Sequence, residues 1–342
     1  MSSQIPQSPA QDRARDTLAT VEKIANAVLY EGYMLYPYRA SAIKNQQRWN
    51  FGTLYAAGFA EIQRPVEQSR MITECLVNGD PAVTIDIRVR FLQLSRRFGP
   101  PVPGQPSQWE EGFEKSIDVC ALPLSALIGQ PKTFPITFND SETSDQQDPH
   151  SSFRHKPLTG TLLVRAEMLQ PELYKVHFEL ENKTKIENVA ICSRNDALLQ
   201  AFVSAHLLLA TEEGHFISLL EPTDAFRQAA AECNNVGSFP VLVSEDGQKR
   251  NDSGAGKIML SSPIILYDYP TIAPESVGDF FDATEMDEML SLRVMTMTDE
   301  EKQEMRGGDR RARAILERTE SLPNEHLMKV HGAVRGMRKV QQ

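Results

Sequence analysis

The sequence predicts an α+β protein in which a hairpin-rich antiparallel β-sheet is followed by a mixed α/β segment and a helical C-terminal tail. Residues 83–91 alternate between apolar and polar side chains, the period of a half-buried strand. From Asn195 onward the apolar positions change to helical spacing. We therefore expect a disordered N-terminus (1–13), a β domain with an N-terminal helix (14–190), a mixed α/β region (191–297) and a helical tail (298–342).

The β domain is expected to begin with a helix and then a hairpin. Apolar side chains within residues 18–29 recur at helical spacing. Two extended runs, 71–76 and 83–94, then flank Asn78-Gly79-Asp80, a composition typical of hairpin turns. We expect these two runs to pair with each other.

The rest of the β domain contains further strands and one polar insertion. The strands are expected at 113–120, 133–138, 161–168 and 173–180. Gln170-Pro171-Glu172 predicts a second hairpin between the last two of them. Residues 139–156 are polar and have almost nothing to bury, so we expect a mobile surface loop there.

The mixed region is expected to start with an amphipathic helix. Ser193 and Asn195 are candidate N-caps, and His206 falls on the apolar face of this helix. The other elements expected here are strands at 216–220, 239–244 and 258–266 and a short helix at 222–233. Thr298 and Glu301 form a capping box that predicts a helix at the start of the tail.

Composition limits the class of protein. The chain has 342 residues and a formal net charge of -10, which argues against a general nucleic-acid or anionic-membrane binder. The polar N-terminus lacks a signal-peptide pattern, and no apolar run is long enough for a membrane span. The 4 cysteines are scattered, as expected for reduced thiols. These features favour a cytoplasmic protein.

Motifs for catalysis, cofactors and metals are missing from the sequence. Gly254-Ala255-Gly256-Lys257 lacks the spacing and the following Ser or Thr of a phosphate-binding loop. The histidines show no zinc-binding spacing, and His206 is most simply a core or interface residue. Cys192, near a helix start, is either a stabilised thiolate or a buried structural thiol. We expect no cofactor and no metal.

One stretch, residues 35–55, interleaves aromatic and basic side chains. Such a stretch can stack on nucleic-acid bases or form a protein-binding hot spot. Alternatively, its aromatic residues lie in the core and its cations pair with acids such as Asp268 or Asp279. Residues 273–305 are strongly acidic, which is typical of a solvated face or a docking surface for a basic partner and less often of paired catalytic carboxylates.

Four stretches resemble a poorly characterised family of bacterial proteins that accompanies uptake [NiFe]-hydrogenase genes. They are 35–55 (LYPYRASAIKNQQRWNFGTLY), 236–243 (VGSFPVLV), 260–282 (LSSPIILYDYPTIAPESVGDFFD) and 290–302 (LSLRVMTMTDEEK). The resemblance implies an accessory role in assembling, maturing or supporting a hydrogenase. It implies no catalytic residues.

We therefore expect a non-catalytic protein that binds a protein partner, either a hydrogenase subunit or a maturation factor. The residues assigned to partner binding are Tyr36, Tyr38, Arg39, Lys44, Asn45, Arg48, Trp49, Asp268, Glu275 and Asp279. The alternative is an enzyme of unknown reaction whose pocket combines Arg39, Lys44 and Arg48 with the carboxylates near 268–282.

Overall fold

The computed structural model describes residues 25–26, 52–63, 67–100, 110–145, 150–244, 254–270, 298–306, 316–317 and 320. The chain divides into two compact units. One comprises Met1–Leu35, Trp49–Pro100 and Gln108–Thr271, and the other comprises Tyr36–Arg48, Pro101–Ser107 and Ile272–Gln342. Every strand named below belongs to the first unit.

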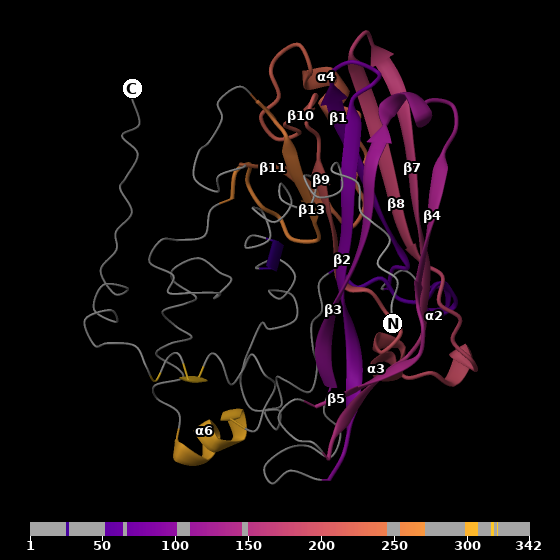
Figure 1. Ribbon diagram of the computed structural model, residues 1–342, viewed down its shortest axis with the longest axis vertical. Helices are drawn as coiled ribbons and strands as arrows, with labels where there is room; N and C mark the ends of the chain where they lie inside the picture. The colour runs from indigo at the N-terminus through magenta and orange to yellow at the C-terminus, as the bar shows by residue number, and fades with distance from the viewer. Residues whose placement is uncertain are drawn as a thin grey trace, which may run out of the picture. The chain divides into compact units, whose positions relative to one another are not determined.

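The first unit contains two antiparallel sheets (Figure 1). The six-stranded sheet has the order β12-β10-β1-β8-β7-β4. Its strands are β12 (Ala255–Gly256), β10 (His215–Ile217), β1 (Arg70–Asn78), β8 (Leu173–Asn182), β7 (Leu158–Gln170) and β4 (Lys132–Phe138).

The seven-stranded sheet has the order β11-β13-β9-β2-β6-β5, and β3 completes it by pairing with β2. Its strands are β11 (Phe239–Val243), β13 (Ile258–Ser262), β9 (Val203–Ala210), β2 (Thr84–Phe98), β6 (Ser152–His155), β5 (Ser141–Ser144) and β3 (Glu110–Pro123). Strands from both sides of residue 190 share each sheet, since β9 pairs with β2 and β10 pairs with β1.

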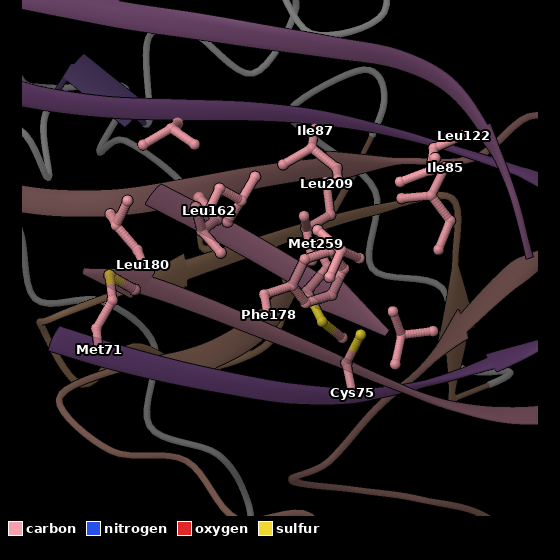
Figure 2. Close-up of a cluster of buried hydrophobic side chains, with 14 of the residues drawn as sticks. Met71, Cys75, Ile85, Ile87, Leu122, Leu162, Phe178, Leu180, Leu209 and Met259 are labelled. Atoms are coloured by element: carbon pink, nitrogen blue, oxygen red, sulfur yellow. The ribbon is translucent and has the colours of Figure 1, made fainter. Parts of the chain in front are cut away.

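The two sheets pack face to face around one apolar core. Figure 2 shows side chains of both sheets pointing toward one another, such as Ile87 of β2 and Phe178 of β8. The alternation of apolar and polar side chains in residues 83–91 explains how β2 contributes to this core. Its apolar residues Ile85, Ile87, Val89 and Phe91 face the core. The intervening Asp86, Arg88 and Arg90 lie on the opposite face of the sheet, so one strand contributes to two environments.

The first predicted hairpin is wrong, although both of its strands exist. β1 pairs with β8 and β10, whereas β2 pairs with β3, β6 and β9. The turn after Asn78 therefore carries the chain from one sheet to the other. Gly79 has a φ of 155°, and a Cβ there would lie 2.8 Å from Val83 Cγ2. Turn residues specify a change of direction; they do not specify the sheet in which the next strand continues.

Several other predicted elements are confirmed. β7 and β8 form the second hairpin, and β11 and β13 lie within the strands predicted at 239–244 and 258–266. The strands predicted at 113–120 and 133–138 lie within β3 and β4. The short helix predicted at 222–233 is α4 (Arg227–Ala231).

The predicted α+β class is wrong, because the described chain is mostly antiparallel β-sheet. The helix expected after Asn195 is reduced to α3 (Arg194–Leu198), and the chain then forms β9. Ser193 does cap α3, since its side chain accepts a hydrogen bond from the Asp196 N–H. β9 is buried along its whole length, and a strand with both faces buried has a continuous apolar run that also fits a helix.

The remaining helices are short. Beside α3 and α4 the structure has α2 (Ala57–Ile62), η2 (Leu124–Ala126), η3 (Val189–Ile191) and α6 (Asp299–Arg306). Beyond α6 the described positions of the predicted tail are 316–317 and 320, which are helical, and the rest of that tail lies outside the described residues. None of the described helices is long and apolar enough to cross a membrane.

The mobile loop predicted at 139–156 is partly regular structure. β5 and β6, both within this range, form a hairpin that extends the seven-stranded sheet beside β2. Phe153 and His155 are buried in it. These two buried side chains in the otherwise polar run 139–156 form too weak a pattern to predict a strand from the sequence.

Candidate partner-binding surface

Of the ten residues assigned to partner binding, the structure describes Asp268. The others lie outside the described residues; they are Tyr36, Tyr38, Arg39, Lys44, Asn45, Arg48, Trp49, Glu275 and Asp279. The geometry around Asp268 therefore decides what this region of the chain can do.

Both carboxylate oxygens of Asp268 accept hydrogen bonds from the first unit. Oδ1 accepts from the Leu242 N–H at 2.8 Å, and Oδ2 accepts from the Ser218 hydroxyl. The Ser218 oxygen in turn accepts from the N–H groups of Leu220 and Glu221, at 3.2 and 2.8 Å. Asp268 is thus a structural anchor that joins β11 to the turn after β10.

This anchor holds residues 263–270, which we call the anchored segment. The Tyr269 N–H donates to the Leu242 carbonyl at 2.7 Å, and the Tyr269 hydroxyl donates to the Ala255 carbonyl at 3.1 Å. Ile264 and Leu266 pack against an apolar cluster that includes Leu208 and Leu260. The segment is therefore fixed by both hydrogen bonds and packing.

The alternate side chains of the anchored segment face solvent. Ile265 is 76% exposed and Tyr267 is 87% exposed. Leu220, on the other side of the Ser218–Asp268 bond, is 52% exposed. Large apolar side chains at such exposure on a fixed segment are typical of an interaction surface. We call Ile265 and Tyr267 the apolar surface.

The described end of the aromatic-basic stretch meets the anchored segment. A Cβ added to Gly52, whose φ is +57°, would lie 2.4 Å from the Pro263 Cβ, so only glycine fits this contact. Leu54 forms an antiparallel β-bridge with Phe202. The Leu54 N–H donates to the Phe202 carbonyl at 2.9 Å, and the Phe202 N–H donates to the Leu54 carbonyl at 3.0 Å. Two stretches singled out separately in the sequence are therefore neighbours at Gly52 and Pro263.

Tyr55, the last residue of that stretch, lies in the core. It is fully buried, and its hydroxyl has no hydrogen-bond partner in the described part of the chain. The Arg194 guanidinium stacks over its ring, with Cζ 5.5 Å from the centroid, and Arg194 also pairs with Glu67 at 2.7 Å. Burial raises the pKa of the Tyr55 hydroxyl well above its usual value. For this residue, the core alternative applies.

A cluster centred on Glu74 was missed by sequence reasoning. His177 Nδ1 lies 3.0 Å from one Glu74 oxygen, and the Asn234 N–H donates to the other at 2.8 Å. Burial alone would raise the pKa of Glu74, but these hydrogen bonds outweigh it and lower that pKa. Glu74 clamps the segment after α4 onto β1, a structural role that only the fold reveals.

A buried Ser–His pair was also missed. Ser95 Oγ lies 2.6 Å from His155 Nδ1, and Thr143 Oγ1 lies 2.9 Å from His155 Nε2. Burial lowers the pKa of His155, so the ring stays neutral. Both side chains are shielded from solvent, and a hydroxyl stands where a triad would place a carboxylate. The pair therefore ties β2 to the β5–β6 hairpin.

His206, Cys192 and Cys233 show no sign of activation. His206 lies in β9, fully buried, and burial together with the Arg90 charge lowers its pKa to about 3. Burial raises the pKa of Cys233 to about 11 and also raises the pKa of Cys192, so both are thiols at neutral pH. This favours the structural interpretation of Cys192.

Across the described ranges, no three His, Cys, Asp or Glu side chains are grouped as metal ligands would be. In the comparisons with known proteins, the sequence matches no protein-family model and no curated protein.

Proposed function

We propose that this protein is a non-catalytic accessory factor that binds a protein partner through the apolar surface, in the assembly, maturation or support of a [NiFe] hydrogenase in the cytoplasm. The observation that carries the proposal is the exposure of Ile265 and Tyr267 on a segment held in place by Asp268.

The anchored segment is suited to binding because it is already ordered. Hydrogen bonds from Leu242 and Ser218 to the Asp268 side chain, and from the Tyr269 N–H to the Leu242 carbonyl, hold the segment in place before any partner arrives. Binding then costs less conformational entropy than ordering a free loop would. Tyrosine is among the residues enriched at interface hot spots, since it contributes a large rigid contact area.

The choice of partner rests on the family resemblance. The anchored segment lies within residues 260–282, one of the four stretches that resemble the hydrogenase-associated family. The acidic residues that follow, including Glu275 and Asp279, would add a charged contact for a basic region of the partner. The basic residues Arg39, Lys44 and Arg48 belong to the same proposal.

Affinity capture from the native cell under hydrogenase-expressing conditions tests this function. The tagged wild-type protein should recover a hydrogenase subunit or a maturation factor, identified by mass spectrometry, at levels above a tag-only control. Deleting the gene should lower hydrogenase activity without changing the amount of hydrogenase transcript. Recovery of no hydrogenase protein, together with unchanged hydrogenase activity in the deletion strain, would contradict the proposal.

A further inference from the structure

The turn between β1 and β2 contains the single Asn-Gly sequence of the chain, Asn78-Gly79. An asparagine followed by glycine is chemically labile, because a glycine without a side chain lets its backbone nitrogen approach the asparagine amide carbon. The same turn carries the chain from one sheet to the other, so a chemical change there affects both sheets. The way the fold holds these two residues therefore determines how fast they react.

One carbonyl holds both of the groups that would react. It belongs to Glu172, in the turn between β7 and β8. The Asn78 side chain donates to it through Nδ2 at 2.9 Å, and the Gly79 N–H donates to it at 2.8 Å. Deamidation removes the proton from the Gly79 nitrogen and expels the side-chain nitrogen of Asn78. Both hydrogen bonds must therefore break before the reaction is complete.

Packing also restricts Gly79. Its φ is 155°, and Val83 Cγ2 and Gly214 Cα lie 2.8 and 3.2 Å from the position that a Cβ would occupy. The next residues are fixed as well, because the Val83 N–H donates to the Asp80 carbonyl at 2.9 Å. The closed turn therefore gives the Gly79 nitrogen little freedom to move onto the Asn78 side chain.

We propose that Asn78 is a deamidation site that the Glu172 carbonyl protects in the folded protein and that local opening of the turn exposes. The Gly79 nitrogen attacks Cγ of Asn78 and forms a C–N bond. Ammonia leaves with the electron pair and takes up the proton lost by the Gly79 nitrogen. Water then adds to one of the two carbonyls of the resulting five-membered ring and breaks its C–N bond, which gives aspartate or isoaspartate. No oxidant or reductant is needed.

Deamidation removes the contact that protects the turn. The product carboxylate is only an acceptor at neutral pH, so it cannot donate to the Glu172 carbonyl as the Asn78 amide does. Isoaspartate also lengthens the backbone by one carbon where the chain crosses between the sheets. A molecule that has reacted once therefore re-forms the closed turn less readily, and the change is irreversible.

The test measures deamidation of Asn78 by peptide mass spectrometry, in the intact protein incubated at mildly alkaline pH. Glu172 offers a matched pair of variants, because its φ of 62° suits glycine and strains a β-branched side chain. In native buffer Glu172→Gly should slow the reaction several-fold, and Glu172→Val should speed it several-fold. In urea all three proteins should react at one rate, since the Asn-Gly sequence is unchanged, and wild type should react several-fold faster than in native buffer.

A control variant separates local opening of the turn from a general loss of stability. Tyr269→Phe removes a hydrogen bond to the Ala255 carbonyl and leaves the turn intact, so it should not change the rate at Asn78. Equal rates for wild type in native buffer and in urea would overturn the proposal. So would equal native rates for the three forms of residue 172, or a rise with Tyr269→Phe as large as that with Glu172→Val.

Discussion

His206 and Arg90 are a buried polar pair on the face of the seven-stranded sheet that lies away from the main core. They are directly opposite on β9 and β2, and His206 Nδ1 donates to the Ser204 carbonyl at 2.9 Å. Arg90 Nη2 donates to Asn26 Oδ1 at 2.6 Å and contacts Glu114 at 3.3 Å. His206 Nε2 has no hydrogen-bond partner in the described residues, so protonating it would place a second cation beside Arg90.

The buried imidazole predicts a pH dependence of stability. The pKa of His206 is about 3 in the folded protein, against the ordinary histidine value of 6.5 that applies in the unfolded chain. Between these values the unfolded chain binds a proton that the folded protein does not. The free energy of unfolding therefore falls as the pH is lowered, by at most about 1.4 kcal/mol per pH unit from this residue.

Chemical denaturation between about pH 6 and pH 5, above the range in which Glu74 titrates, measures this slope. His206→Gln should flatten the slope, whatever it does to stability at neutral pH. Equal slopes for the variant and the wild type would mean that His206 is not the residue responsible.

Tyr55 gives a second prediction at the residue scale. Its buried hydroxyl has no hydrogen-bond partner in the described chain, so Tyr55→Phe should stabilise the protein by about 1 kcal/mol in urea denaturation. Tyr269→Phe is the matched control, because that hydroxyl donates to the Ala255 carbonyl, and it should destabilise by about 1 kcal/mol. If the free energy of unfolding fell by a similar amount in both variants, the Tyr55 hydroxyl would have a hydrogen-bond partner.

Two edge strands carry a proline that limits further strand pairing. β4 pairs with β7 and β11 pairs with β13, and they contain Pro135 and Pro240. A proline within a paired strand is tolerated where its nitrogen faces the open edge. Each edge therefore lacks one donor that an added strand would need.

Pro135→Thr restores that donor between Thr133 and Thr137 on the open edge of β4. The variant should self-associate at high concentration, as measured by light scattering coupled to size-exclusion chromatography. Thr137→Val is the control, since it makes the same exposed face more apolar without adding a donor. Equal elution and mass for Pro135→Thr and wild type at every concentration would argue against this role for Pro135.

At the scale of the whole molecule, the sequence predicts strands better than it predicts their partners. The period of two in β2 and the turn residues between β7 and β8 are local, and both lead to correct elements. The transfer of the chain from β1 to β2 across the sandwich depends on which sheet has room for the second strand. The turn at Gly79 carries no such information.

β9 and Asp268 illustrate two further features that the sequence alone does not predict: burial of both faces of a strand, and contacts between residues far apart in the chain. The run from Leu198 to Leu207 is apolar enough for either a helix or a doubly buried strand, and packing on β2 and β13 decides between them. The sequence singled out Asp268 as a partner-binding residue or an acid that pairs with a cation, but its bonds to Leu242 and Ser218 join residues far apart in sequence. The exposure of Ile265 and Tyr267 follows from that anchor and from the alternation of an extended segment.

The central claim is that the apolar surface binds a protein partner, and quantitative affinity capture with surface variants tests it most directly. The double variant Ile265→Ser/Tyr267→Ser should lose the hydrogenase protein recovered by the wild type. Met168→Ser, which changes another exposed apolar side chain on β7, should retain it. Undiminished capture by a correctly folded double variant would contradict the claim, as would equal loss in the Met168→Ser control.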